Sequence, residues 1–281
     1  MRHILALAAS TGLALAMAAP AHADHHMASA TISAENHQAM QAALADARRA
    51  DDRARDTFRN PGETLAFFGV EPGMTVVDYM PAGGWYTRVL VPYLGANGRY
   101  IGLTPDPAAA DNERFGNYFA GLPKDYTDNV GKWNLTGAPN MVAATGAAEL
   151  EPYQGEVDRV LIFREMHNLY RSGVLHSELT RIRNLLADDG MLGIVQHRAK
   201  PWATGDYTSG NNGYLRQQDV IGLIEAHGFQ LVGTSEVNAN PRDTADYEGG
   251  VWELPPAMRG DNEARRSVGE SDRMTLLFRK R

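Results

Sequence analysis

The sequence predicts an α/β protein built on a mainly parallel sheet that helices cover on both faces. Short apolar runs alternate with helical patterns along residues 61–281, as in strands joined by right-handed helical crossovers. The first apolar run ends in Asp78, and a glycine-containing turn follows it. The chain has 281 residues, of which 43% are hydrophobic and 22% charged. This composition is typical of a folded globular protein and excludes a mainly disordered or fibrous chain.

Seven strands and three helices are predicted within residues 61–281. The strands cover residues 74–78, 99–103, 140–145, 157–163, 190–196, 229–237 and 273–279, and the helices cover residues 85–94, 175–186 and 218–227. No helical pattern precedes the last strand, so an antiparallel addition at the sheet edge is expected. Residues 104–135 and 198–215 are rich in Gly, Asn, Asp and aromatic residues. We expect them to be long loops, which in compact domains are usually functional or disordered.

The first 23 residues have the layout of a secretory signal peptide. A basic start at Arg2 precedes an apolar run, and small residues flank a cleavage site after Ala23. The apolar run is shorter than the roughly 20 residues that a membrane-spanning helix needs, so cleavage is favoured over a membrane anchor. The mature chain is therefore expected to be secreted, and to be periplasmic if the source is a Gram-negative bacterium. No membrane association is expected after cleavage.

Residues 24–60 are expected to form a polar tail and a charged helix before the main domain, residues 61–281. His25 and His26 are adjacent in the tail, and we predict no metal site there. A helix is predicted from Ala34 to about Arg59, with Ser33 as its N-cap and Asn60-Pro61 as its stop. The mixed charges of its second half are typical of a solvated helix face, and a partner-binding helix is the alternative.

The composition excludes several classes of function. The formal net charge is −7, from 27 basic and 34 acidic residues, so the basic face of a nucleic-acid-binding protein is not expected. The chain has no cysteine, which excludes disulfides, thiolate nucleophiles and cysteine metal sites. His-Glu-x-x-His, EF-hand and Gly-x-Ser-x-Gly patterns are also absent. The sequence therefore predicts neither a metal site nor the commonest kind of α/β hydrolase.

The turn after the first predicted strand is the strongest candidate for a ligand site. Gly83 and Gly84 let the backbone pass close to a ligand, and the following helix offers free N–H groups at its N-terminus. Asp78 is placed at the carboxyl end of the strand, where open α/β sheets bind ligands. A tight strand-to-helix turn without a ligand is the alternative.

The segment from Asp78 to Thr87 resembles the first motif of class I S-adenosylmethionine-dependent methyltransferases. Three later segments also resemble motifs of that superfamily, namely residues 157–168, 185–197 and 226–229. More narrowly, residues 61–70, 83–87 and 272–280 resemble a family of predicted exported bacterial methyltransferases. The resemblance covers about residues 53–281, so the main domain is expected to be methyltransferase-like.

The resemblance implies a Rossmann-like sheet of strand order 3-2-1-4-5-7-6, with the seventh strand antiparallel and S-adenosylmethionine across the carboxyl ends of the first strands. In such enzymes an acidic residue after the second strand holds the ribose, and another after the third strand meets the adenine. Here Thr104 and Ala147 stand at those places, with Asp106 and Glu149 close by as substitutes. The implied cofactor-binding residues are Asp78, Pro81, Gly83, Gly84, Trp85, Tyr86, Thr104, Asp106 and Glu149. Met80 and Ala82 depart from the family, in which glycines are common there.

Candidate catalytic residues follow the fourth predicted strand. Methyl transfer is an in-line displacement, so the protein mainly positions the nucleophile and removes its proton. A neutral imidazole at His167 suits that base, with Glu165 or Asn168 orienting it or the substrate. A histidine that only satisfies backbone groups is the alternative, and His197 is a weaker candidate of the same kind. Two aromatic loops favour a small-molecule pocket, and their residues are Trp202, Tyr207, Tyr214, Arg216, Tyr247 and 252–256.

The sequence thus predicts a secreted transferase that moves a methyl group from S-adenosylmethionine to a small-molecule acceptor. The alternative is an exported protein of methyltransferase fold that has lost catalysis and binds some other small ligand. Thr104 and Ala147 favour the alternative, whereas Asp78, the glycine turn and His167 favour the enzyme. A purely structural role for the charged N-terminal helix has no motif to support it.

Overall fold

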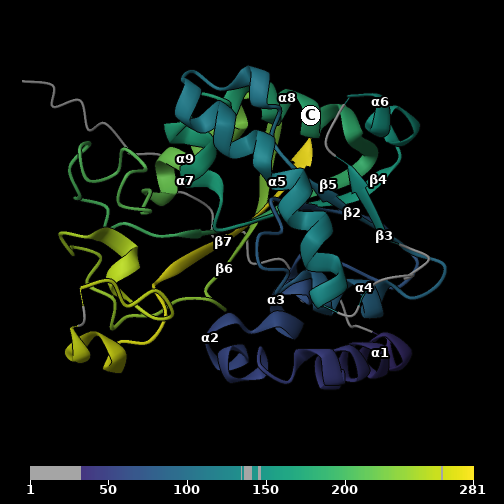
Figure 1. The fold of residues 1–281 in the computed structure, drawn as a ribbon, viewed down its shortest axis with the longest axis horizontal. Coiled ribbons are helices and arrows are strands. Elements are labelled where there is room, and N and C mark those ends of the chain that lie inside the picture. The colour runs from purple at the N-terminus through teal and green to yellow at the C-terminus, as the bar shows by residue number, and fades with distance from the viewer. Residues whose placement is uncertain (1–32, 134, 136–140, 145–146, 261) are drawn as a thin grey trace, which may run out of the picture.

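The computed structural model describes residues 33–133, 135, 141–144, 147–260 and 262–281. The predicted signal peptide and the histidines of the tail lie outside these residues. One twisted sheet runs through the middle of the molecule, with helices on both of its faces (Figure 1). In the described part of the chain, no helix is both long enough and apolar enough to cross a membrane.

Seven described strands form this sheet, in the order β3-β2-β1-β4-β5-β7-β6. They are β1 (Thr75–Tyr79), β2 (Arg99–Leu103), β3 (Met141–Ala144), β4 (Val157–Phe163), β5 (Leu186–His197), β6 (Phe229–Ser235) and β7 (Arg273–Lys280). β1 pairs in parallel with β2 and β4, β2 with β3, and β4 with β5. β7 runs antiparallel between β5 and β6. The predicted α/β, Rossmann-like class is confirmed.

Two apolar cores lie on the two faces of the sheet. The described helices are α1 (Ala34–Ala45), α2 (Asp56–Arg59), α3 (Pro61–Phe67), α4 (Thr87–Leu94), α5 (Glu113–Lys132), α6 (Ala147–Leu150), α7 (Met166–Arg171), α8 (Leu175–Leu185) and α9 (Gln217–Ala226). Alternate strand residues pack on one face with α5, α7, α8 and α9, and on the other with α1, α3 and α4. This alternation is what a strand buried between two helical layers requires.

The N-terminal segment differs from the single solvated helix that the sequence predicts. Ser33 does cap α1, since its Oγ accepts a hydrogen bond of 3.1 Å from the Asn36 N–H. The helix then ends at Ala45, and residues 46–60 turn back in short 3₁₀ and α-helical turns. Arg49 and Arg59 in this stretch are buried, not solvated. The segment packs on α3 and α4 as part of the same core as the rest of the chain.

The expected loop at residues 104–135 is mostly a helix, α5. Its N-cap is Asn112, whose Oδ1 accepts a hydrogen bond of 3.1 Å from the Phe115 N–H. Glycines such as Gly116 and Gly121 favoured a loop in the sequence, but apolar residues recur at helical spacing through them and through Pro123. These residues are Phe115, Phe119, Leu122, Tyr126 and Val130, followed by Trp133. Burial of this stripe outweighs the low helix propensity of the interrupting residues.

β5 begins at Leu186, four positions before the predicted start of that strand at Gly190. Its pairing with β4 shifts register between Val157 and Arg159, so that Val157 faces Leu186 and Arg159 faces Met191. The extra residues of β5 form a bulge. Asp188, Asp189 and Gly190 lie within this bulge.

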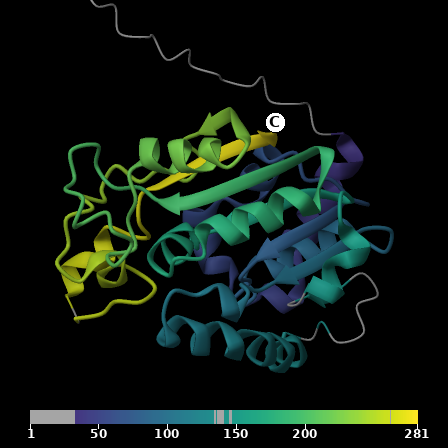
Figure 2. The same cartoon turned by 90° about the horizontal axis from the view of Figure 1, so that it is seen from above.

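The long loops after β5 and before β7 gather on one side of the molecule, beyond the ends of those strands (Figure 2). The first loop has no helix, as expected from residues 198–215. Tyr214 and Tyr247 are buried where the two loops pack together, and the Tyr214 hydroxyl donates a 2.9 Å hydrogen bond to Asp243. The loops therefore form a small core of their own.

Candidate functional site

The turn that follows β1 is built from residues in unusual backbone conformations. Met80, Ala82 and Gly84 have φ values of 53°, 47° and 69°, a region that only glycine enters without strain. A Cβ on Gly84 would lie 2.4 Å from Cζ2 of Trp133, so this position requires glycine. A Cβ on Gly83 would meet no atom within 4 Å. Gly83 therefore faces open space, whereas Gly84 is part of the packing.

Asp78 lies beneath this turn and is 2% exposed. The Tyr100 hydroxyl donates a hydrogen bond of 2.9 Å to Asp78 Oδ2 and lies 2.7 Å from the Thr87 hydroxyl. Burial raises the pKa of Asp78 to about 7, against the effect of the hydrogen bond from Tyr100. The carboxyl group is thus held between β1, β2 and α4.

Three adjoining cavities surround the carboxyl ends of β1, β2 and β4. Cavity A, about 230 Å³, lies between the turn, the end of β2 and α5. Cavity B, about 160 Å³, lies between the turn, residues 52–59 and the residues after β4. Cavity C, about 480 Å³, lies between the residues after β4, the start of α5 and the two long loops. A and B share residues 80–83, B and C share Arg164 and Glu165, and A and C share Tyr118.

Cavity A presents two buried hydroxyl groups that make no hydrogen bond within the described residues. They are the Thr104 hydroxyl, at the end of β2, and the Tyr126 hydroxyl, on α5. Thr104 is 3% exposed and Tyr126 is 5% exposed. A buried hydroxyl without a partner is costly, so a polar ligand in cavity A would remove that cost. The sequence predicted Thr104 as a cofactor-binding residue and missed Tyr126.

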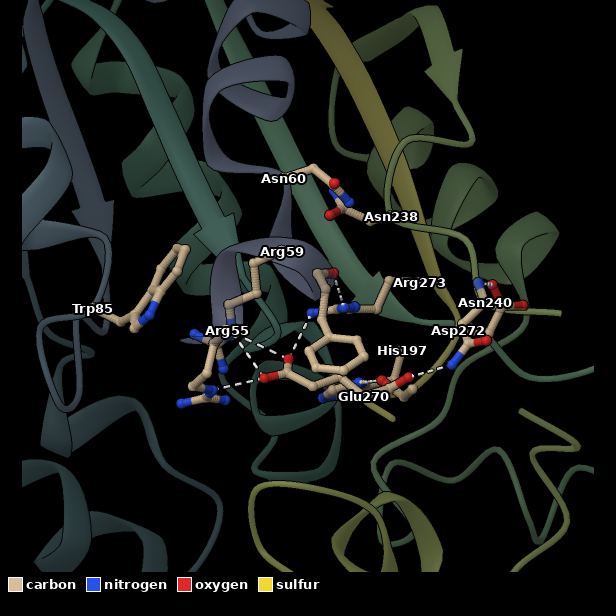
Figure 3. A network of polar contacts seen from close by, with 12 residues as sticks. Arg55, Arg59, Asn60, Trp85, His197, Asn238, Asn240, Glu270, Asp272 and Arg273 are labelled. Atoms are coloured by element: carbon tan, nitrogen blue, oxygen red, sulfur yellow. Dashed lines mark hydrogen bonds and ion pairs between the residues drawn. The ribbon is translucent and has the colours of Figure 1, made fainter. Parts of the chain in front are cut away.

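One wall of cavity B includes Arg55 and Arg59, which belong to a cluster of arginines around Glu270 (Figure 3). Nε of Arg55 and Nε of Arg59 lie 2.7 and 3.1 Å from Glu270 carboxylate oxygens, and Nη1 of Arg273 lies 3.0 Å away. Burial disfavours the Glu270 carboxylate, but the three arginines outweigh it and lower the pKa of Glu270 to about 2. Nη1 of Arg59 is buried and has no partner in the described residues. Cavity B therefore has a cationic wall.

Trp85 and Tyr86 fasten the N-terminal segment to the turn. The Trp85 indole N–H donates a 3.3 Å hydrogen bond to the Asp52 carbonyl, and the Arg59 guanidinium lies 4.7 Å from the centre of the Trp85 ring. The Tyr86 ring stacks on Phe163, with the ring centres 3.5 Å apart. Both predicted aromatic residues thus pack within the protein and also line cavity B.

The predicted catalytic residues Glu165, His167 and Asn168 all line cavity C. Nδ2 of Asn168 donates a 2.5 Å hydrogen bond to Oε2 of Glu165, and Nε of Arg171 donates one of 2.9 Å to Oδ1 of Asn168. Burial raises the pKa of Glu165 to about 7. The Glu165 side chain is therefore oriented by its neighbours and exchanges a proton near neutral pH.

His167 is 5% exposed, and its Nδ1 has no partner in the described residues. Burial, reinforced by Arg171, lowers the pKa of His167 to about 4, so the imidazole is neutral at pH 7. His197 also lines cavity C, with its ring centre 5.9 Å from that of His167 and its Nδ1 2.6 Å from the Ser271 hydroxyl. Burial lowers the pKa of His197 as well. Both histidines enter the cavity as uncharged groups.

Two predicted cofactor residues are not brought to the cavities. Asp106 is exposed, and its carboxylate caps a short 3₁₀ turn by accepting a 2.9 Å hydrogen bond from the Ala108 N–H. Glu149 is exposed on α6, and neither residue lines cavity A, B or C. Pro81 does line cavities A and B, whereas Gly84 serves the packing of Trp133. The substitution of Asp106 and Glu149 for the missing acids is therefore not supported.

The aromatic loops contribute unequally to the site. Trp252 lines cavity C, whereas Trp202 and Tyr207 line a separate cavity of about 580 Å³ between the loops. Tyr214 and Tyr247 are buried in the loop core. Among the described residues, no three His, Asp or Glu side chains are grouped to hold a metal ion.

The sequence analysis missed several residues of the cavities. Those that line A, B or C without being predicted include Arg55, Arg59, Tyr118, Tyr126, Arg114 and Arg171. The helical stripe through α5 was a usable signal for Tyr126. The burial of Arg59 depends on Glu270, 211 positions away, and no local pattern indicates it.

Comparisons with solved structures identify the fold of this chain. No family model matches the chain, and no curated protein matches it. Among solved structures, a protein assigned as a sarcosine dimethylglycine methyltransferase from Galdieria sulphuraria is similar, with 12% identity, a TM-score of 0.51, and coverage of 82% of this chain and 87% of that one. A geranyl diphosphate C-methyltransferase from Streptomyces coelicolor, solved with S-adenosylhomocysteine, has 15% identity, a TM-score of 0.49, and coverage of 85% and 88%. The likeness to the Galdieria protein shows that this chain has a methyltransferase fold.

Proposed function

We propose that this protein transfers a methyl group from S-adenosylmethionine to a small-molecule acceptor. The proposal rests on one observation. In a chain with a methyltransferase fold, three cavities adjoin one another at Glu165 and at the turn after β1. Cavities A and B together would take the cofactor, and cavity C would take the acceptor. Arg164 and Glu165, which line both B and C, lie where the two would meet.

The residues present fit the chemical parts of S-adenosylmethionine. The unpartnered hydroxyls of Thr104 and Tyr126 in cavity A suit the polar edges of adenosine. The unpartnered Nη1 of Arg59 in cavity B suits the carboxylate of the methionine part. Gly83, between the two cavities, leaves room for a ligand against the backbone. When bound, the cofactor supplies an electrophilic methyl group on a sulfonium centre.

Glu165 is the base in this proposal. A general base works best when its pKa lies near the working pH, and the pKa of Glu165 is about 7. Asn168, itself held by Arg171, donates a hydrogen bond to its carboxylate, which keeps the acceptor's proton within reach. His167, whose pKa is about 4, is a weaker base and serves instead to orient the acceptor through an uncharged ring nitrogen. The roles of Glu165 and His167 are thus exchanged relative to the sequence-based hypothesis.

Ligand-dependent thermal unfolding tests the proposal. The protein from Asp24 onward would be heated with S-adenosylmethionine, with S-adenosylhomocysteine, and with ATP as control. A ligand at about 100 times its dissociation constant stabilises by about 2.7 kcal/mol, which raises the melting temperature by several degrees. We expect a shift with both methyl-donor forms and none with ATP. The absence of a shift at millimolar concentrations would favour the small-ligand-binding protein instead.

Export is the second part of the proposal, and it rests on the predicted signal peptide. Expression in a Gram-negative host should place the protein in the periplasmic fraction, with an N-terminus at Asp24 after cleavage at the small-residue site. N-terminal sequencing of the purified protein checks this. A chain that keeps Met1 and stays in the cytoplasm would contradict it.

A further inference from the structure

Cavity C has an excess of positive charge. Arg114 at the start of α5, Arg164 after β4, Arg171 on α7 and Arg259 in the last long loop all line it. One carboxylate, that of Glu165, lines it as well. The histidines of the cavity are uncharged at pH 7. Three separate segments of the chain therefore bring four guanidinium groups to one cavity of about 480 Å³.

These arginines differ from the other arginines in or near the core. Arg49, Arg88 and Arg198 each form an ion pair with a carboxylate, at 2.6 to 2.9 Å. Among the described residues, no carboxylate forms an ion pair with any of the four arginines of cavity C. Nη1 of Arg164 is also buried without a hydrogen bond there. A buried guanidinium N–H without an acceptor is costly, so an anion from outside the chain would remove that cost.

The aromatic wall of cavity C does not offer a free apolar surface. The Arg171 and Arg259 guanidiniums lie 5.8 and 5.3 Å from the centre of the Trp252 ring. The His167 ring meets the same indole edge-on, with the ring centres 5.9 Å apart. The ring therefore holds two cations in place by cation–π attraction. This arrangement favours a charged ligand over an apolar one.

We propose that the methyl acceptor is an anionic small molecule, whose carboxylate or phosphate group binds the arginines of cavity C. Arg114 and Arg259 are exposed and line the entrance, whereas Arg164 and Arg171 are partly buried. Charge-assisted hydrogen bonds from guanidiniums to such oxyanions are short, strong and directional. The inference names the acceptor class for the function proposed above and rests on it.

Calorimetric titration of the protein from Asp24 onward with inorganic phosphate and, separately, with citrate tests the inference at low ionic strength. Sodium chloride of equal ionic strength is the reference. We expect at least one of the two anions to bind. Arg114→Gln and Arg259→Gln should each weaken that binding about tenfold, the effect of losing one charge-assisted hydrogen bond. Arg279→Gln is the matched control, because Arg279 lies on β7 opposite Met191, at the other end of β5 from cavity C.

The outcomes separate the inference from the proposed function. Stronger binding of phosphate supports a phosphorylated acceptor, and stronger binding of citrate supports a carboxylate acceptor. If neither anion binds, or if Arg279→Gln weakens binding as much as Arg114→Gln, the anionic acceptor is overturned. S-adenosylhomocysteine is titrated into the same preparation. If S-adenosylhomocysteine binds and neither anion does, only the inference about the acceptor is overturned. If an anion binds and S-adenosylhomocysteine does not, the methyltransferase function is overturned and cavity C remains an anion site.

Discussion

The segments that follow β1 and β4 begin side by side, because these strands are paired in parallel. They differ in whether their buried polar groups have hydrogen-bond partners within the protein. At the end of β1 and in the turn after it, these polar groups find partners within the protein: Tyr100 donates a hydrogen bond to Asp78, and the Trp85 indole N–H donates one to the Asp52 carbonyl. After β4, Nη1 of Arg164 and Nδ1 of His167 are buried without partners in the described residues. Buried polar groups are nearly always paired in folded proteins. The first segment thus satisfies the polar groups named above by itself, whereas the second leaves polar groups for a ligand to pair with.

The largest effect is expected in the second segment, from Glu165→Gln. The amide cannot take up a proton, so methyl transfer should fall by roughly 10² to 10⁴, whereas binding of S-adenosylhomocysteine should stay within about twofold. The measurement is the transfer of tritiated methyl from S-adenosylmethionine into a small-molecule periplasmic extract. His167→Asn is the companion variant. A larger loss of rate in that variant would return the role of base to His167.

In the first segment, Asp78 should make stability depend on pH. Its pKa of about 7 in the folded protein lies above the ordinary 3.8, so the folded state holds the proton more tightly than the unfolded state does. The resulting stabilisation is complete below about pH 4 and is lost as the pH rises to about 7, by up to about 4 kcal/mol. Urea unfolding of the wild type and Asp78→Asn at pH 4.5 and 7.5 checks this. Parallel pH profiles for the two proteins would contradict it.

Gly84→Val tests whether the turn is structural. The new side chain would overlap the Trp133 ring at a φ of 69°, and we expect the free energy of unfolding to fall by about 3 kcal/mol. Urea denaturation measures the change. Gly84→Ala combined with Trp133→Ala should recover the part of the loss that comes from overlap. A stable single variant would show that Trp133 moves freely away from the turn.

Gly83→Val is the counterpart at the neighbouring position and should affect binding alone. Its side chain would enter open space beside cavities A and B, so the melting temperature should change by no more than about 2 °C. Affinity for S-adenosylhomocysteine should fall about 100-fold, because the side chain takes the ligand's place. Calorimetric titration measures it. Unchanged affinity would place the cofactor away from this turn.

The sequence predicts the strands of the sheet well because each buried strand is a short run of apolar residues, which is visible in the local sequence. Six of the seven strands begin within one residue of their predicted positions. The exception is β5, whose bulge depends on its pairing with β4. α5 was missed because its glycine, asparagine and aspartate residues outweighed, in the prediction, an apolar stripe that folding buries.

The site was predicted only in part, because the local sequence shows which residues end a strand but not which distant side chains meet them. Asp78, Glu165 and His167 follow directly from their places at strand ends, where a parallel sheet brings separate segments together. Asp106 was implied by the family resemblance, as a substitute for the acidic residue expected after the second strand, but its carboxylate is used as a cap. The charge of cavity C arises from arginines on three segments that are far apart in the sequence, and only the folded chain reveals that none of the four has an acidic partner among the described residues.

The arginine cluster around Glu270 also has a consequence for the order in which the protein is made. Arg55 and Arg59 leave the ribosome early, but Glu270 follows them by 215 and 211 positions, close to the end of the chain. The wall of cavity B therefore cannot close on a nascent chain. A chain that stops before Glu270 would leave Arg55 and Arg59 without the carboxylate that holds them, so this wall of cavity B would not form.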